Sequence, residues 1–198
     1  ALWTRFLPAY EAAGAWLREG RIGAVRAIQS SFGFNIPYDA STRHWDPGQA
    51  GGALLDIGVY NLSTAQWALQ QSGLDTELQD FSAEAKLAPS GVDAALLATM
   101  RFAGDVHLQF RCGFDALADN SLRIFGERGH VLMDPIAGQA SIHGAHGATE
   151  VLETLRPDLR YPAGAPVRNL IGVMQGAEAN RATGRLGQHV TDLIDAAL

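Results

Sequence analysis

The segment Gly51-Gly52-Ala53-Leu54-Leu55-Asp56-Ile57-Gly58-Val59-Tyr60-Asn61 is the stretch around which this 198-residue chain is organised. Its paired glycines precede an apolar pattern of helical period, which predicts a helix over residues 53–71. The expected buried stripe of that helix consists of Leu55, Val59, Leu62 and Leu69. Residues four apart share one face of a helix, so Asp56 and Tyr60 are the candidate catalytic pair. Spacing alone favours a structural role, with an acid near a helix start and a tyrosine at the edge of a core, because such i, i+4 pairs of polar residues are common.

Three glycines in this stretch require an explanation. Gly51 and Gly52 carry no side chain, so a backbone or a ligand can approach them closely. Gly58 lies inside the expected helix, where glycine costs about 1 kcal/mol relative to alanine. We therefore expect a closely packed neighbour beside Gly58. The start of this helix is otherwise apolar, so we also expect a partner for the Asp56 carboxylate.

The rest of the chain contains more strands than helices. We expect further helices over residues 10–20, 167–179 and 186–198, and strands over residues 24–34, 77–87, 92–102, 106–114, 122–125, 130–133, 139–143 and 149–152. Residues 35–49 and 154–166 are rich in proline and are expected to be irregular. Consecutive strands joined by short turns are typical of α+β proteins with an open, largely antiparallel sheet. We expect residues 1–198 to form a single domain.

The segment of residues 106–114 has the clearest strand pattern. Apolar side chains occupy every second position (Val106, Leu108, Phe110, Cys112 and Phe114), and polar side chains lie between them. This period of two predicts a sheet with one packed face and one face that is polar or contacts a partner.

Composition excludes several classes of function. The formal net charge of −6 argues against nucleic acid as a partner, because phosphate binding requires a basic surface. No apolar run approaches the roughly 18 residues that indicate a membrane span, so the sequence predicts no membrane partner. The single cysteine, Cys112, is expected to be a buried, reduced thiol. Together these features predict a cytoplasmic protein.

Two common site signatures are missing. No strand is followed by Gly-x-Gly-x-x-Gly and a helix, so the chain contains no dinucleotide-binding fingerprint. His143 and His146 are close in sequence, but no cysteine or cluster of acids accompanies them at ligand spacing. We therefore expect no metal site.

Four segments resemble one family in order and spacing. The segment of residues 51–60 is similar to the substrate-domain signature of the glucose-fructose oxidoreductase/inositol dehydrogenase/rhizopine catabolism (Gfo/Idh/MocA) family. Trp3-Thr4-Arg5-Phe6-Leu7-Pro8, Gly20-Arg21-Ile22-Gly23-Ala24-Val25 and Phe125-Gly126-Glu127-Arg128-Gly129 resemble further segments of it. The first of these, together with Tyr60, is most similar to the branch of dimeric dihydrodiol dehydrogenase and D-xylose dehydrogenase.

The resemblance implies a fold and a function. It implies the C-terminal substrate domain, an open sheet with helices on one face, without the N-terminal Rossmann domain that binds the cofactor. Family members oxidise an alcohol with NAD or NADP, so the implied substrate is a sugar, polyol or cyclic diol. The implied partners are the protein's own N-terminal domain and a second copy of the chain, bound through the sheet face as a homodimer. We expect a longer polypeptide, and no turnover by this chain alone.

The resemblance also assigns the catalytic pair. Asp56 and Tyr60 match an Asp-x-x-x-His or Asp-x-x-x-Tyr pair that acts beside a lysine of a Glu-Lys-Pro motif. The only lysine, Lys86, lacks the flanking residues of that motif. Histidine titrates near 6.5 and tyrosine near 10, so Tyr60 would act as a base only beside a lysine ammonium. Otherwise Tyr60 positions the substrate oxygen or relays its proton, and Asp56 orients that network.

Other residues are candidates for substrate and cofactor contacts. Trp3 and Phe32 are expected to form an aromatic wall of the substrate site, although both also suit an ordinary core. Arg5 and Asn61 are candidates for substrate contacts. Arg43 is a candidate for a cofactor phosphate, or is simply exposed. Two other functions stay open: a non-catalytic oligomerisation or ligand-binding module, and, with less support, a hydrolase that uses Asp56.

Overall fold

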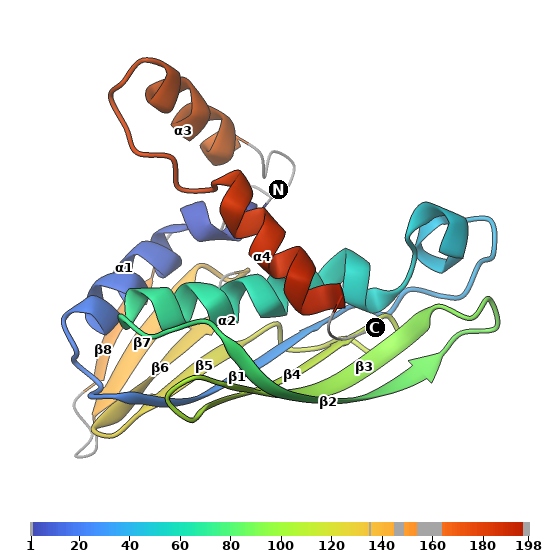
Figure 1. The fold of residues 1–198 in the computed structure, drawn as a ribbon, viewed down its shortest axis with the longest axis horizontal. Helices are drawn as coiled ribbons and strands as arrows, with labels where there is room; N and C mark the ends of the chain where they lie inside the picture. The colour runs from blue at the N-terminus through green and yellow to red at the C-terminus, as the bar shows by residue number, and fades with distance from the viewer. Residues whose placement is uncertain (1, 135, 145–148, 154–163, 196–198) are drawn as a thin grey trace.

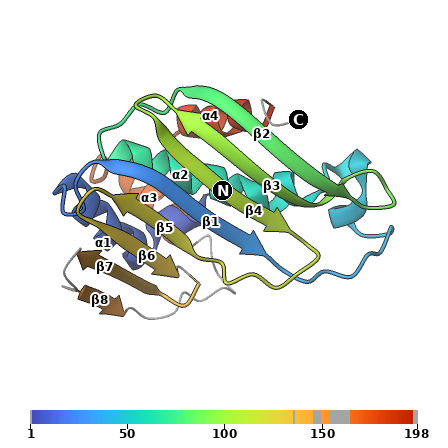
Figure 2. The same ribbon diagram turned by 90° about the horizontal axis from the view of Figure 1, so that it is seen from below.

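A single sheet with helices on one side forms the body of the chain. The structure is a computed structural model and describes residues 2–134, 136–144, 149–153 and 164–195. The helices α1 (Pro8–Arg18), α2 (Val59–Gln71) and α4 (Gly184–Asp195) lie over one face of the sheet (Figure 1). α3 (Gly164–Met174) lies farther from the sheet, beside the N-terminal 3-10 turn η1 (Trp3–Phe6). Within the described residues the opposite face carries no helix, as the view from below shows (Figure 2).

The sheet has eight strands in the order β2-β3-β4-β1-β5-β6-β7-β8. Their bounds are β1 (Val25–Gly33), β2 (Leu78–Leu87), β3 (Asp93–Phe102), β4 (Val106–Gly113), β5 (Leu122–Gly126), β6 (Gly129–Asp134), β7 (Gln139–Gly144) and β8 (Thr149–Glu153). β1 pairs with β4 in parallel, and all the other pairs are antiparallel. The prediction of an α+β fold with a largely antiparallel sheet is confirmed.

The alternation in β4 sets the two faces of the sheet. Val106, Leu108, Phe110 and Cys112 are buried beneath the helices, and His107 and Gln109 between them are exposed on the other face. The same alternation continues in β3, where Leu96 and Ala98 are buried and Leu97 is 49% exposed. The predicted packed face and polar face are therefore both present.

The first helix follows the predicted pattern. Pro8 occupies its first turn, where its fixed φ suits a helix and its missing N–H costs nothing. Ala13, Trp16 and Leu17 form the buried side that packs on the sheet. β1 begins seven residues after α1 ends, so this short connection places both elements beside α2.

The predicted buried stripe of the central helix was wrong at its first position. Leu55 is 37% exposed and Leu54 is fully buried, whereas Leu62 and Leu69 are buried as expected. Val59 is only partly buried. The cause is a π-helical turn (Leu54–Gly58), called η4, that precedes α2. A π turn contains more residues than an α turn, so it shifts the buried side by one residue.

The C-terminal elements differ slightly from the predicted bounds. α3 begins three residues before the expected residue 167 and ends at Met174. Residues 154–163, 196–198 and His146 lie outside the described residues, so the predictions there are not compared. In the part of the chain that is described, no helix combines the length and apolar character needed to cross a membrane.

Candidate functional site

Backbone carbonyls crowd the paired glycines at the start of the central helix. A Cβ on Gly51 would lie 2.8 Å from the carbonyl oxygens of Arg43, His44 and Asp46. The backbone N–H of Gly51 donates to the Asp46 carbonyl oxygen at 3.0 Å, and that of Gly52 donates to the His44 carbonyl oxygen at 2.9 Å. The predicted close backbone approach is confirmed, and it attaches the loop of residues 35–49 to the helix start.

Asp93, at the start of β3, caps this helix from across the fold. Its Oδ2 accepts a hydrogen bond from the backbone N–H of Leu54 at 2.7 Å. Gly52 has φ +108°, and a Cβ at Gly52 would overlap the Asp93 carboxylate. Burial raises the pKa of Asp93 despite the backbone hydrogen bonds that it accepts. The helix start is therefore held by an acid 39 residues later in the sequence.

Gly58 brings the helix against the sheet. A Cβ at Gly58 would lie 2.9 Å from Leu54 Cδ1 and 3.0 Å from Cys112 Sγ. The prediction of a closely packed neighbour is confirmed, and the neighbour is a β4 side chain. Cys112 is a free, fully buried thiol. Burial first, and the nearby charge of Asp93 second, raise the pKa of Cys112 to about 12.

Asp56 is paired with the loop that leads to the glycines. Its carboxylate lies 2.7 Å from Arg43 Nη1 and 3.9 Å from His44 Nε2. The Asp56 side chain is 19% exposed and the Arg43 side chain is 55% exposed. The partner expected for Asp56 is thus present. Arg43 lies at the rim of the site, and its contact with a cofactor stays a prediction.

Tyr60 borders a small cavity between α2 and β1. Its ring packs on Phe32 with centroids 5.4 Å apart, and both residues line the cavity together with Asn61. Asn61 is 2% exposed, and its Nδ2 donates to Ser30 Oγ. The Asn61 Oδ1 has no hydrogen-bond partner. A buried acceptor left unpaired is uncommon in folded proteins, and Thr4 Oγ1 at the same cavity is also without a partner.

The structure therefore brings Tyr60, Phe32 and Asn61 together, but it gives Asp56 different neighbours. The π turn that contains Asp56 faces the loop, and Tyr60 on the first turn of α2 faces β1. The joint action of Asp56 and Tyr60 stays a prediction. Further polar residues that line the cavity were not singled out from the sequence, among them Ser30, Ser31, Thr64, Asn120 and Ser121. These five come from three separate segments, and no local sequence pattern signals them.

Trp3 and Arg5, the two candidates near the N-terminus, differ in burial and in their neighbours. Arg5 is 7% exposed, and its guanidinium donates to Ser63 and Gln66 of α2, so it fastens η1 to that helix. Trp3 is partly buried, and its neighbour Thr4 lines the Tyr60 cavity. Contacts of Trp3 and Arg5 with substrate stay predictions.

Lys86 has a different partner. It lies on β2, with Nζ 3.4 Å from Asp115 Oδ2, whereas Tyr60 packs on β1. Lys86 therefore does not supply a lysine to the Tyr60 cavity. Among the described residues, no three or more His, Cys, Asp and Glu side chains are grouped so that they could hold a metal ion.

Comparison with known proteins decides the family. Residues 10–132 match the family model of the GFO/IDH/MocA C-terminal domain. The chain belongs to this family. The match includes the paired glycines, Asp56, Tyr60 and the capping residue Asp93. The GFO/IDH/MocA fold expected from the sequence is thus confirmed.

Curated relatives of this domain are dehydrogenases. The chain is 34% identical over 136 residues to the trans-1,2-dihydrobenzene-1,2-diol dehydrogenase of Bos taurus, and 34% identical over 136 residues to that of Homo sapiens. Each alignment covers 68% of this chain and 39% of the relative. The chain thus matches well under half of the length of these relatives.

Solved structures share the fold. An aldose-aldose oxidoreductase from Caulobacter crescentus matches 98% of this chain with a TM-score of 0.80 and 23% identity, over 58% of its own length. A 3-ketoreductase from Actinomadura kijaniata, in complex with NADP and TDP-benzene, matches 99% of this chain with a TM-score of 0.79 and 22% identity, over 60% of its length. A levoglucosan dehydrogenase in complex with NADH and levoglucosan matches 96% of the chain, with a TM-score of 0.80, 16% identity and 60% of its own length. At these identities the likeness shows the fold alone.

Proposed function

We propose that this chain is the substrate domain of a nicotinamide-dependent oxidoreductase. The full protein would transfer hydride between a hydroxyl-bearing carbon of a sugar, polyol or cyclic diol and NAD or NADP. The observation that carries this proposal is the small cavity lined by both Tyr60 and Asn61, whose Oδ1 has no hydrogen-bond partner. Membership of a family whose named relatives are dehydrogenases and oxidoreductases supports it.

The cavity has a volume of about 20 Å³, which fits one hydroxyl group of a substrate, so the rest of a sugar or diol would lie outside it. Asn61 Oδ1 can accept a hydrogen bond from one substrate hydroxyl, and the Tyr60 phenol can donate one to the reacting oxygen. Phe32 supplies an apolar wall against the Tyr60 ring. Asn61 is held in place by its bond to Ser30, so its acceptor is oriented before the substrate arrives. A pre-oriented group avoids part of the entropy cost of binding.

Alcohol oxidation also requires a proton acceptor. Hydride leaves the carbon with its electron pair, and the hydroxyl proton must pass to a group within hydrogen-bond reach. Tyr60 is the chain's own candidate to relay that proton, because its oxygen can accept the substrate proton as its own phenol proton passes to a further base. The single lysine, Lys86, is paired with Asp115 on β2. The lysine that the family places beside Tyr60 would therefore come from another part of a longer protein.

Asp56 would act on the geometry of the site. Its ion pair with Arg43 joins the π turn to the loop, and the charge of Arg43 lies at the rim, where it could meet a cofactor phosphate. The cofactor itself, when bound, supplies the hydride chemistry. We propose that its main binding site is an N-terminal domain, and that this chain alone does not turn over.

Two further features of the full protein belong to the same proposal. A homodimer would use the sheet face that carries no helix among the described residues, where Leu97 is 49% exposed. The location would be cytoplasmic, where a buried, reduced Cys112 is the usual state. A monomer by analytical ultracentrifugation across the working concentration range would contradict the dimer.

The test uses the longer protein that contains this domain. Tyr60→Phe should lower kcat by about 100-fold or more, and Asp56→Asn should lower it as well, with the melting temperature nearly unchanged. Tyr38→Phe is the matched control, because it removes the same hydroxyl from a tyrosine that is 45% exposed and packs on Trp45. Unchanged nicotinamide reduction in both site variants would overturn the assignment.

The alternative is a module of the same fold without chemistry. It predicts that the longer protein binds sugars or diols in calorimetry but reduces no nicotinamide with any of them. Asn61→Ala then separates the two ideas. In an enzyme this variant should raise KM or lower kcat, in a ligand-binding module it should weaken sugar or diol binding without any turnover, and in an oligomerisation module it should change only stability.

A further inference from the structure

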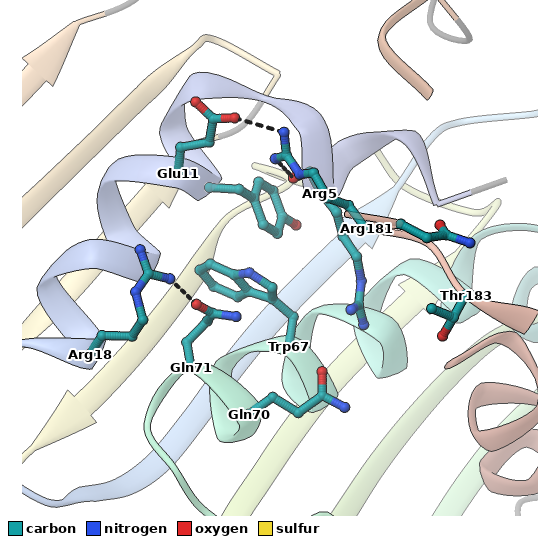
Figure 3. Close-up of a pocket in the computed structure, with 10 residues that line it drawn as sticks. Arg5, Glu11, Arg18, Trp67, Gln70, Gln71, Arg181 and Thr183 are labelled. Carbon is teal, nitrogen blue, oxygen red and sulfur yellow. Dashed lines mark hydrogen bonds and ion pairs between the residues drawn. The ribbon is translucent and has the colours of Figure 1, made fainter. Parts of the chain in front are cut away.

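A second pocket lies on the helical side of the fold. It has a volume of about 590 Å³ and is bounded by α1, α2 and the segment of residues 180–183 that precedes α4. Three arginines line it: Arg5, Arg18 and Arg181. Figure 3 shows them around Trp67, with Gln70 and Gln71 on the side of α2. Neither the sequence patterns nor the proposed function assigns a role to this pocket.

The charge of the pocket is unbalanced. Glu11 is the one acidic residue among those lining it in the described chain, and it is already paired with Arg181 at 2.9 Å. Arg181 also donates to the backbone oxygen of Arg5 at 3.0 Å and lies over the Phe6 ring at 4.7 Å. Arg181 and Glu11 thus neutralise each other, and no second acidic residue among the described residues that line the pocket balances the charges of Arg5 and Arg18.

Arg5 is the unusual member of this group. Its three hydrogen bonds go to neutral acceptors, at 3.2 Å to Ser63 Oγ, 2.7 Å to the Ser63 carbonyl oxygen and 3.2 Å to Gln66 Oε1. Over the described ranges, no carboxylate lies within ion-pair distance of it. Burial lowers the pKa of Arg5 to about 10. A buried charge without a counter-charge is costly, so the arrangement calls for an anion.

The other groups in the pocket suit the same ligand. Arg18 extends from the last turn of α1 and donates to the side-chain oxygen of Gln71, which is neutral. Trp67 forms an aromatic wall and is held by an edge contact with Tyr10, with ring centroids 4.8 Å apart. In Figure 3 the end of the Arg5 side chain lies between Trp67 and Thr183. A Cβ on Gly14 would lie 3.2 Å from Arg18 Nη1 and 3.3 Å from Trp67 Cζ2, so the Arg18 cation borders this aromatic surface.

We propose that this pocket binds a small organic anion, whose carboxylate or phosphoryl group pairs with Arg18 and whose apolar part lies against Trp67, with the buried charge of Arg5 on the other side of Trp67. Guanidinium groups hold planar oxyanions through paired N–H bonds. The pocket is separate from the Tyr60 cavity, although Tyr10 lines both. The proposal does not depend on the proposed oxidoreductase function, because none of its groups acts in hydride transfer.

The experiment titrates the chain with three probes. Benzoate carries a carboxylate on a planar ring, inorganic phosphate carries only the oxyanion, and benzamide is the neutral analogue of benzoate. Calorimetry should give a Kd below about 1 mM for benzoate or phosphate and no binding of benzamide. In ¹⁵N NMR the indole signal of Trp67, assigned from a Trp67→Phe variant, should shift on titration, whereas that of buried Trp45 should not. Tighter binding of phosphate than of benzoate would favour a phosphoryl ligand, and the reverse a carboxylate.

Variants then locate the site. Arg18→Gln removes one charge from the pocket and should weaken binding about tenfold, the loss expected for one charged hydrogen bond. Arg26→Gln is the matched control, since Arg26 is 58% exposed and pairs with Glu127 elsewhere on the surface.

Three outcomes would overturn the proposal. The first is equal binding of benzamide and benzoate, and the second is binding that Arg18→Gln and Arg26→Gln weaken to the same extent. The third is a Kd above about 10 mM for every anion. That result would mean that the arginines are neutralised by solvent, or by a carboxylate of a longer protein, rather than by a free ligand.

Discussion

Gly52→Ala should destabilise the start of the helix that carries Asp56 and Tyr60. At φ +108° an alanine is strained, which costs about 1–3 kcal/mol. The new Cβ would also displace the Asp93 carboxylate, so the N–H of Leu54 would lose its acceptor. A buried donor left without a partner costs about 1–3 kcal/mol. The expected total is about 3 kcal/mol, a large part of the roughly 5–15 kcal/mol that stabilise a domain.

Gly91→Ala is the matched reference for this measurement. Gly91 has φ +89°, and a Cβ there would meet nothing within 4 Å. It therefore reports the backbone strain without the displaced cap. Urea unfolding, with free energies compared at equal m-values, should show that Gly52→Ala loses about 2 kcal/mol more than Gly91→Ala.

A double-mutant cycle isolates the contribution of Asp93. In an Asp93→Ala background the cap is already absent, so Gly52→Ala should lose only the strain energy. The two substitutions should be non-additive by about 2 kcal/mol, as expected for groups in contact. Additive losses, or equal losses for Gly52→Ala and Gly91→Ala, would refute the capping role of Asp93.

Three further predictions concern other groups. Cys112, whose pKa burial raises to about 12, should not react with a thiol reagent in the folded chain at neutral pH and should react fully in urea; equal rates in both states would contradict this. Burial raises the pKa of Asp93, so in the window between the ordinary pKa of an aspartate and this raised pKa the folded state holds a proton that the unfolded state has released. Wild type should therefore lose stability relative to Asp93→Asn as pH rises through this window, and a difference independent of pH would contradict the shift. Arg43→Gln should lower the free energy of unfolding by less than about 1 kcal/mol, because the Arg43 side chain that pairs with Asp56 is 55% exposed. A larger loss in urea unfolding, or one that high salt does not reduce, would contradict this.

Local patterns sufficed for most of the fold. The alternation from Val106 to Cys112 predicts which face of β4 is buried, and Pro8 and Trp16 predict α1. The helical glycine Gly58 predicts a close neighbour, which is Cys112. Each of these inferences depends on residues within one or two turns or on one strand. Such patterns survive folding because tertiary contacts reinforce the local preference.

The candidate site was less predictable, because its contacts join distant segments. Asn61 pairs with Ser30, Leu54 is capped by Asp93, and Arg5 binds Ser63. None of these pairings leaves a period or a motif in the sequence. The π turn escapes prediction for a related reason, since it depends on how the helix start fits the sheet and not on residue preferences.

The π turn gives Asp56 and Tyr60 different neighbours. In a regular helix Asp56 and Tyr60 would lie directly above one another, and both would face β1 or both the loop. The wider turn at Leu54–Gly58 rotates Asp56 relative to α2, so that Asp56 pairs with Arg43 while Tyr60 packs on Phe32. π turns inside helices are often found at functional sites. The anchors of this turn are the carbonyls beside Gly51, the Asp93 cap and the Gly58–Cys112 contact. Because they come from the loop, β3 and β4, loss of any one anchor should disturb Asp56 before it disturbs Tyr60.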